Sequence, residues 1–192
     1  LTNDKSELDK AENSDSLYCF PNRLEDIAVL ENAIYNGGNY AAYYLGCLFY
    51  DKGRWEESKE LWEKCADNIK LPTVYRNLSL VYYNKLKDGV LAIKAMEKAF
   101  SIDKSDARIF FELDQLYKTL NFSLEKRLEN MNENSDLLEK RDDLYTEYIT
   151  LLNMNGEYDN AYNRIMNHNF HPWEGGEGKI PAQYRIALIN KA

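Results

Sequence analysis

Apolar residues recur along this chain at intervals of three and four, which is the spacing of an amphipathic helix. A short example lies between 23 and 35, where the apolar positions are Leu24, Ile27, Leu30 and Ile34. Pro21 and Asn22 precede this stretch and suit a helix start, whereas Gly37 and Gly38 are expected to end it. The pattern therefore predicts a helix over residues 23–35, and the same spacing predicts helices over most of the chain that follows.

The helical pattern itself repeats with a period of about 34 residues. Three stretches share one order of aromatic, small and apolar residues: Tyr44-Leu45-Gly46 with Phe49, Gly53 and Trp55; Leu78-Ser79 with Tyr82, Ala92 and Ala99; and Tyr148 with Leu152, Gly156, Tyr158 and Ala161. This order resembles the tetratricopeptide repeat, in which small residues let two helices cross closely and aromatic residues fill the gaps. The resemblance implies an all-α fold, a right-handed superhelix of antiparallel helix pairs (an α-solenoid), whose usual work is binding.

The register assigns the first full repeat to residues 39–70. Gly46 on its first helix and Ser58 on its second are expected where the two helices touch. The second repeat begins at Pro72. The third begins near Ala107 and is the weakest, because its second helix has polar residues where small or apolar ones are expected, namely Lys126, Asn130 and Glu133. The stretch 130–143 is accordingly predicted to be a hinge or an irregular connection.

Composition divides the chain into three parts. Residues 1–17 are polar and charged, and they predict a flexible arm or linker. Residues 18–168 carry the helical repeats, and 169–192 are expected to form a capping loop and a terminal helix. That helix is predicted to follow Pro181, and the residues expected to cap the open end of the stack are Tyr184, Ile186, Leu188 and Ile189.

The first helices of such repeats line the inner surface, so the register also predicts a groove. The residues projected onto it are Tyr40, Tyr43, Tyr50, Arg76, Tyr83, Asn84, Arg108, Phe111, Gln115 and Lys118. An aromatic and cationic groove holds an extended peptide or a partner helix through stacking and charge-assisted hydrogen bonds. The alternative is that individual tyrosines only pack against the next repeat. A carboxylate-clamp groove is not expected, because Tyr43 and Cys47 stand where that version of the repeat has Lys and Asn.

The segment from Phe170 to Lys179 interrupts the helical pattern with three glycines and a proline. Loops of this composition often carry function, and the candidate ligand-binding residues here are His171, Trp173, Glu174, Glu177 and Lys179. Their spacing matches neither a phosphate-binding loop nor a strong metal-site pattern. Two interpretations stay open: Trp173 stacks on a sugar ring, or Phe170 and Trp173 pack as a cap over the last repeat.

The charge balance disfavours some classes of binding partner. The 192 residues include 32 acidic and 24 basic side chains, and the net charge of −8 disfavours binding to nucleic acid and to anionic membranes. No apolar run approaches the roughly 20 residues that cross a bilayer. A cytoplasmic location is expected, and the predicted partner is a protein or peptide.

The sequence contains no clear set of catalytic residues. No serine or cysteine nucleophile comes with an identifiable histidine and acid partner, since the only histidines are His168 and His171. Cys19, Cys47 and Cys65 follow neither a paired nor a metal-binding spacing and are expected to be small buried side chains. We therefore predict a chain that is not an enzyme and that uses no cofactor and no metal.

A second resemblance covers about residues 20 to 180. It rests on five segments: Phe20-Pro21-Asn22-Arg23-Leu24-Glu25, Tyr50-Asp51-Lys52-Gly53-Arg54, Phe111-Glu112-Leu113-Asp114-Gln115-Leu116-Tyr117, Arg141-Asp142-Asp143-Leu144-Tyr145 and the loop from Phe170 to Lys179. These are similar to a bacterial family of large, uncharacterised proteins in which a β-sandwich region, itself similar to galactose-mutarotase-like domains, precedes the helical repeats. The resemblance implies that this chain, which begins at Leu1, is the helical C-terminal part of such a protein. Its partner is then that upstream region or another protein, with carbohydrate recognition beside the loop as the alternative.

Overall fold

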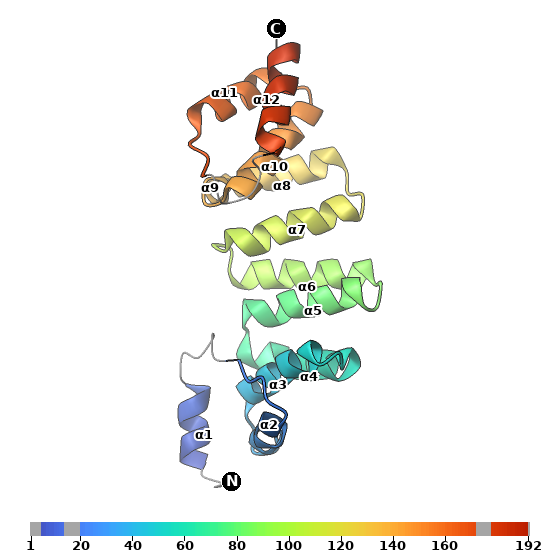
Figure 1. Ribbon diagram of the computed structural model, residues 1–192, viewed down its shortest axis with the longest axis vertical. Helices are drawn as coiled ribbons and strands as arrows, with labels where there is room; N and C mark the ends of the chain where they lie inside the picture. The colour runs from blue at the N-terminus through green and yellow to red at the C-terminus, as the bar shows by residue number, and fades with distance from the viewer. Residues whose placement is uncertain (1–4, 14–19, 172–177, 192) are drawn as a thin grey trace. The chain divides into compact units, whose positions relative to one another are not determined.

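The computed structural model describes residues 5–13, 20–171 and 178–191, and every regular element within those ranges is a helix (Figure 1). The chain divides into two compact units, Leu1–Ile102 (unit 1) and Asp103–Ala192 (unit 2). Unit 1 contains α1 (Lys5–Glu12), α2 (Glu25–Tyr35), α3 (Asn39–Asp51), α4 (Trp55–Ile69), α5 (Pro72–Asn84) and α6 (Gly89–Ile102). Unit 2 contains α7 (Ala107–Thr119), α8 (Leu124–Glu133), α9 (Ser135–Leu138), α10 (Asp142–Met154), α11 (Tyr158–Asn167) and α12 (Lys179–Asn190). The predicted all-helical class is confirmed.

Two helix pairs, α3 with α4 and α5 with α6, form most of unit 1. Gly53 closes the first pair at φ +77°, in the left-handed region that favours glycine. Pro72 opens α5 at a position where its missing N–H has no helical partner to lose. The predicted starts of the first and second repeats therefore agree with the structure.

The crossing of α3 and α4 is built on the small residues that the register places there. Ser58 Oγ donates a hydrogen bond of 2.8 Å to the Gly46 carbonyl, and Trp62 Nε1 donates one of 3.1 Å to the Tyr43 carbonyl. A Cβ atom on Gly46 would lie only 2.4 Å from Trp62 Nε1. Glycine is therefore required for the indole to pack against the α3 backbone.

The crossing of α5 and α6 repeats this arrangement with the hydroxyl on the first helix. Ser79 Oγ donates a hydrogen bond of 2.8 Å to the Ala92 carbonyl, and both residues are buried. Because each hydroxyl is satisfied by a carbonyl of the partner helix, two polar groups are buried without an orphaned donor.

The predicted flexible arm contains a helix. The Glu12 carboxylate at the end of α1 accepts hydrogen bonds of 3.0 to 3.3 Å from the backbone N–H groups of Asn39 and Tyr40. The N-cap residue of α3 is Gly38, which has no side chain for capping, so Glu12 satisfies donors at the start of that helix. The prediction for residues 1–17 did not include this helix, because periodicity does not reveal a capping contact 27 positions away.

The third helix pair, α7 with α8, is better packed than its sequence suggests. The buried residues of α8 are Arg127, Leu128 and Met131. Lys126 and Glu133, which the register placed on the core side, are exposed. The predicted hinge over 130–143 contains the short helix α9, in which Leu137 and Leu138 are buried. The stretch is a packed connection, because its leucines reach the core of unit 2.

The C-terminal helix differs from the prediction in its start and in its packing. It begins at Lys179, ahead of Pro181, and its buried residue is Ala187. The Tyr184 ring lies 5.7 Å from that of Tyr162 on α11. The other three residues expected to cap the stack are largely exposed, at 41%, 42% and 74% for Ile186, Leu188 and Ile189. The capping prediction is wrong for these three, because α12 packs against α11 and α10 and its buried residue is Ala187.

Candidate protein-interaction surface

Five of the predicted groove residues lie on α3 and α5, and we call them the A-helix surface of unit 1: Tyr40, Tyr50, Arg76, Tyr83 and Asn84. Asn84 is exposed and the other four are half-buried. Cys47 and Asn77 stand between them at helical spacing, and their Sγ and Nδ2 atoms approach to 3.9 Å, which brings the two helix faces side by side. The Tyr50 ring also packs 5.8 Å from Trp62, so one of its faces is structural.

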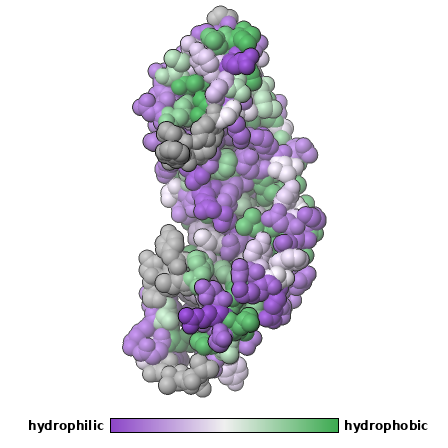
Figure 2. All heavy atoms as spheres, in the orientation of Figure 1, coloured by the Kyte–Doolittle hydropathy of each residue, from purple (hydrophilic) through white to green (hydrophobic). Residues whose placement is uncertain are grey.

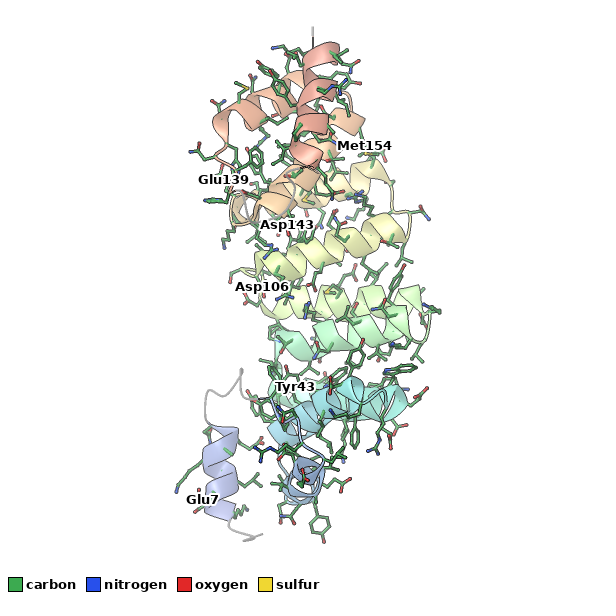
Figure 3. The ribbon with its side chains drawn as sticks, viewed as in Figure 1. Glu7, Tyr43, Asp106, Glu139, Asp143 and Met154 are labelled. Atoms are coloured by element: carbon green, nitrogen blue, oxygen red, sulfur yellow. The ribbon has the colours of Figure 1, made fainter. Side chains whose placement is uncertain are left out.

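Tyr43 does not belong to this accessible set. Its side chain, labelled on α3 in Figure 3, is only 3% exposed. Burial raises the pKa of its hydroxyl well above the ordinary range for tyrosine, and the neighbouring Cys47 adds to that shift. The groove prediction is therefore wrong for Tyr43, since a buried ring offers no surface to a partner. The alternative, a tyrosine that packs within the fold, is right at this position.

The other four predicted groove residues lie on α7 in unit 2: Arg108, Phe111, Gln115 and Lys118. Arg108 is exposed and pairs with Glu112 at 3.2 Å, a surface contact that contributes little to stability. Lys118 is exposed as well, and its ammonium lies 2.7 Å from the buried carboxylate of Glu147. Arg108 and Lys118 are thus accessible cations, although Lys118 is also tied to the interior of the unit, whereas Phe111 and Gln115 are half-buried.

That interior holds a charged cluster that the sequence does not predict. Arg127 on α8 donates two hydrogen bonds to Asp114 on α7, of 3.0 and 2.7 Å, and one of 2.9 Å to Glu147 on α10. Asp114, Arg127 and Glu147 are 0%, 5% and 2% exposed. Charged groups are buried at this depth only when they are paired and hydrogen-bonded. The cluster joins three helices and is structural.

The pKa values of the two carboxyls move in opposite directions. Burial is the largest influence on both. It raises the pKa of Asp114 above its ordinary value in spite of Arg127. At Glu147 the hydrogen bonds from Lys118 and Arg127 outweigh burial and hold the pKa below its ordinary value. Two cations donate hydrogen bonds to Glu147 and only one donates to Asp114, and the negative charge of Glu147 raises the pKa of Asp114 further.

A sequence signal for this cluster exists in the spacing. Ser79 and Ala92, which meet at the α5–α6 crossing, are 13 residues apart, and so are Asp114 and Arg127. The ion pair thus occupies the repeat position where a small residue is expected. Because a small or apolar residue is expected at this position of the repeat, the register placed the neighbouring Lys126 there instead of Arg127.

The N-terminal end of the loop from Phe170 to Lys179, together with His168 before it, packs on the start of α10. His168 Nε2 lies 2.9 Å from Asp142 Oδ1, and the backbone N–H of His171 donates to Asp142 Oδ2. The His168 ring stacks on Tyr145 with centroids 4.0 Å apart, and Phe170 packs edge-on against the same pair. Phe170 therefore packs as the structural-cap interpretation expects. His171 and Lys179 are exposed.

Three of the five predicted loop residues, Trp173, Glu174 and Glu177, lie outside the described residues. In the ranges that the structure describes, no group of three or more His, Cys, Asp and Glu side chains is arranged to hold a metal ion. The same ranges contain no helix that is both long and apolar enough to span a membrane.

The cysteines behave as packing residues. Cys65 is buried and Cys47 is half-buried, while Cys19 lies outside the described residues. Burial raises the pKa of the Cys47 thiol to about 11 and that of Cys65 to about 12. Both thiols are therefore protonated near neutral pH, and neither is activated as a nucleophile.

Unit 1 also has a groove of about 310 Å³ between α4, α5 and α6 that sequence reasoning missed. Glu63 and Asp67 line one side of it, and Lys94 and Lys98 are also among its lining residues. The Tyr75 hydroxyl donates to Asp67 at 2.7 Å, and the Tyr82 hydroxyl donates to Glu63 at 2.7 Å. These tyrosine hydroxyls are satisfied within the protein, so they do not call for an external ligand.

Comparison with solved structures places this arrangement among known folds. MamA superposes with a TM-score of 0.57 over 86% of this chain and 86% of MamA, at 14% sequence identity. YrrB, described as a TPR protein with an unusual peptide-binding site, superposes with a TM-score of 0.56 over 97% of this chain and 84% of YrrB, at 16% identity. The chain has a tetratricopeptide-like fold.

The tetratricopeptide-like fold is an α-solenoid, as the repeat pattern predicts. At identities this low the likeness shows the fold and not a shared ligand. No protein-family model matches the chain. The resemblance to bacterial proteins with an upstream β-sandwich region is therefore unsupported by these comparisons.

Proposed function

We propose that this chain is a non-catalytic protein-interaction scaffold that binds a peptide or a partner helix on the A-helix surface of unit 1. The observation that carries the proposal is the exposure of Asn84 and the partial exposure of Tyr40 and Tyr83 on helices that also carry many buried residues. The tetratricopeptide-like fold supports it, since helical repeats commonly present such surfaces to extended ligands.

The chemistry of the surface suits a polypeptide. Tyrosine rings give a large contact area at a small cost in side-chain entropy, and their hydroxyls stay available for hydrogen bonds. The Asn84 side chain has both a donor and an acceptor, which is the pair that a peptide backbone requires. Figure 2 shows polar and apolar residues mixed over the face of the molecule that is in view.

The proposal is tested by selecting peptides from a random display library on the purified chain and titrating the enriched sequences. Tyr83→Ala is expected to weaken binding by about tenfold, as a hot-spot tyrosine does, with an unchanged melting temperature. Val90→Ala on α6 is the control, because Val90 is 66% exposed and lies outside this surface. Failure to enrich any peptide, or equal affinity for Tyr83→Ala and wild type, overturns the proposal.

The identity of the partner is a finer proposal. The sequence resemblance points to an upstream region of the same polypeptide, and another protein is the other candidate. Amide NMR titration of the chain with that upstream region, expressed separately, distinguishes them. Chemical-shift changes at Tyr40, Tyr83 and Asn84 would support the upstream region as the partner. If these changes are absent, the upstream region is excluded as the partner.

The alternative role in carbohydrate recognition rests on Trp173, with Glu174 or His171 to bind sugar hydroxyls. Trp173 and Glu174 lie outside the described residues, and the exposed His171 ring lies 3.4 Å from Asp142 Oδ2. The N-terminal flank of the loop packs on the start of α10, and these contacts by themselves do not favour sugar binding. It stays a hypothesis from sequence. Unchanged saccharide binding by Trp173→Ala in the parent protein would exclude it.

A further inference from the structure

The groove between α4, α5 and α6 in unit 1 has rims of opposite charge. Glu63 and Asp67 line it from α4, and Lys94 and Lys98 line it from α6. All four residues are exposed. Residues four positions apart lie one above the other on the same face of a helix, about 6 Å apart along its axis. Each rim is therefore a short row of two like charges, acidic along α4 and basic along α6.

The two rows do not neutralise each other. The carboxylates of Asp67 and Glu63 accept hydrogen bonds of 2.7 Å from Tyr75 and Tyr82 of α5. Burial and the hydrogen bond to Asp67 raise the pKa of Tyr75 to about 12, so its hydroxyl stays protonated and fixes that carboxylate. The Lys98 ammonium lies 6.0 Å from the centre of the Tyr75 ring. In the described part of the chain, no ion pair joins either lysine to these carboxylates.

The floor of the groove is apolar and its small residues leave room for a backbone. Ala66 of α4, Leu78 of α5 and Ala95 of α6 line the groove and are only 4%, 3% and 7% exposed. An extended peptide would place its backbone N–H and C=O groups against this floor without partners. A helix satisfies its own backbone, and alanines on two neighbouring helices let it approach closely. The floor therefore favours a helical occupant.

We propose that this groove is a second interaction site, which binds an amphipathic helix with a basic row on one flank, an acidic row on the other and small apolar residues between them. The basic row lies along α4 and the acidic row along α6, so the order of the charges also sets the direction of the bound helix. The residues that line the groove differ from those of the A-helix surface, so the inference is independent of the proposed function. Charges at the rim of an interface select the partner more than they add affinity, and selectivity is the property to test.

The test uses three designed helical peptides, each about three heptads long, with the same stripe of leucine and alanine. The mixed peptide has lysine on one flank and glutamate on the other, and the two others are basic or acidic on both flanks. Each labelled peptide is titrated by fluorescence anisotropy with the wild-type chain, with Lys94→Glu/Lys98→Glu and with Lys87→Glu/Lys104→Glu. The last variant is the control, because it makes the same change of charge at exposed lysines outside the groove.

The wild type and the control are expected to bind the mixed peptide roughly tenfold more tightly than either of the others. In Lys94→Glu/Lys98→Glu both rims are acidic, so its preference should change to the basic peptide. A wild type that does not prefer the mixed peptide overturns the inference, and so does the same preference in all three proteins. Lys94→Gln/Lys98→Gln removes the charges without reversing them. It should lose the preference for the mixed peptide, and it serves if the reversed variant does not fold.

Three further outcomes separate the inference from its alternatives. A mixed peptide with a central proline cannot form a continuous helix and should not bind; equal binding would mean an extended occupant. Tyr83→Ala should leave the affinity for the mixed peptide unchanged; a loss would place the peptide on the A-helix surface. Dimerisation of the wild type in analytical ultracentrifugation that Lys94→Glu/Lys98→Glu abolishes would make a second copy of the chain the occupant. Each of these three results overturns the inference and leaves the scaffold function to its own test.

Discussion

The first helix pair of unit 1 and that of unit 2 meet at equivalent positions with opposite chemistry. In unit 1, Gly46 and Ser58 stand 12 residues apart and join α3 to α4 through one hydroxyl and one carbonyl. In unit 2, Asp114 and Arg127 stand 13 residues apart and join α7 to α8 through a two-pronged ion pair. A repeat position is thus defined by where two helices cross, and small size is only one way to fill it.

The two kinds of helix crossing respond differently to substitution. A small-residue crossing tolerates no added volume, because the neighbouring indole already touches the backbone. A buried ion pair tolerates no loss of a partner, because the remaining charge has left water and has nothing to replace it. Variants at the two crossings therefore separate the two cases.

The largest effect is expected at the ion cluster. Arg127→Ala leaves the carboxylates of Asp114 and Glu147 buried, with only Lys118 still paired to Glu147, and should lower the free energy of unfolding by about 3–5 kcal/mol. Urea unfolding followed by circular dichroism measures it. Arg108→Ala, which breaks an exposed pair, is the control and should cost about 0–1 kcal/mol. Equal losses for the two variants would contradict the buried-charge account.

The comparison is sharpened by removing the whole cluster. In the variant Asp114→Leu/Arg127→Met/Glu147→Leu no charge is stranded, so its stability should lie within about 2 kcal/mol of the wild type. A triple variant as unstable as Arg127→Ala would mean that the ion cluster itself, and not the stranded charge, holds unit 2 together.

The next effect is expected at the small-residue crossing. Gly46→Ala adds a Cβ atom 2.4 Å from Trp62 Nε1 and 2.6 Å from its Cδ1. The forced shift should cost about 1–3 kcal/mol, more than the gain of up to about 1 kcal/mol from better helix propensity. Gly178→Ala is the matched control, because its Cβ meets nothing within 4 Å. A raised melting temperature for Gly46→Ala would show that the crossing is loose.

A smaller difference is expected between the caps of the two units. Asp106, labelled at the start of α7 in Figure 3, accepts hydrogen bonds from the N–H groups of Arg108 and Ile109, whereas α3 depends on the distant Glu12. Asp106→Ala should cost about 1 kcal/mol, and Glu12→Gln about 0.3–1 kcal/mol. Thermal unfolding of both variants ranks the local cap against the remote one, and a larger loss for Glu12→Gln would reverse the ranking.

The smallest effect concerns acid stability. Burial raises the pKa of Asp142, but the hydrogen bonds from His168 and the His171 backbone outweigh it, and the net pKa lies below the ordinary value of 3.8. The stabilisation from this carboxylate is therefore present above that value and is lost as the pH falls through the lowered pKa. Asp142→Asn should show a flatter decline of unfolding free energy between pH 5 and pH 3 in a series of urea titrations. An unchanged slope of unfolding free energy against pH would show that Asp142 does not contribute to the loss of stability in acid.

The repeat register predicted much of unit 1 and less of unit 2. Gly46, Ser58 and Pro72 stand where it placed them, because tight crossings and helix starts require particular residue types. Tyr43 was misplaced because a register states which side of a helix a residue takes and not what covers that side. Arg127 was missed because its charge is acceptable in the core only beside two carboxylates from other helices.

By itself, the sequence determined that this chain is helical, that its helices come in pairs of a tetratricopeptide-like kind, and where most of the pairs begin. Periodicity and turn residues are local properties, so they can be read along the chain. The tertiary structure alone decided which tyrosines are buried, that Glu12 caps α3, and that an ion cluster replaces a small-residue contact. These features depend on partners far apart in the sequence, and the balance between desolvation and pairing is set only when those partners meet.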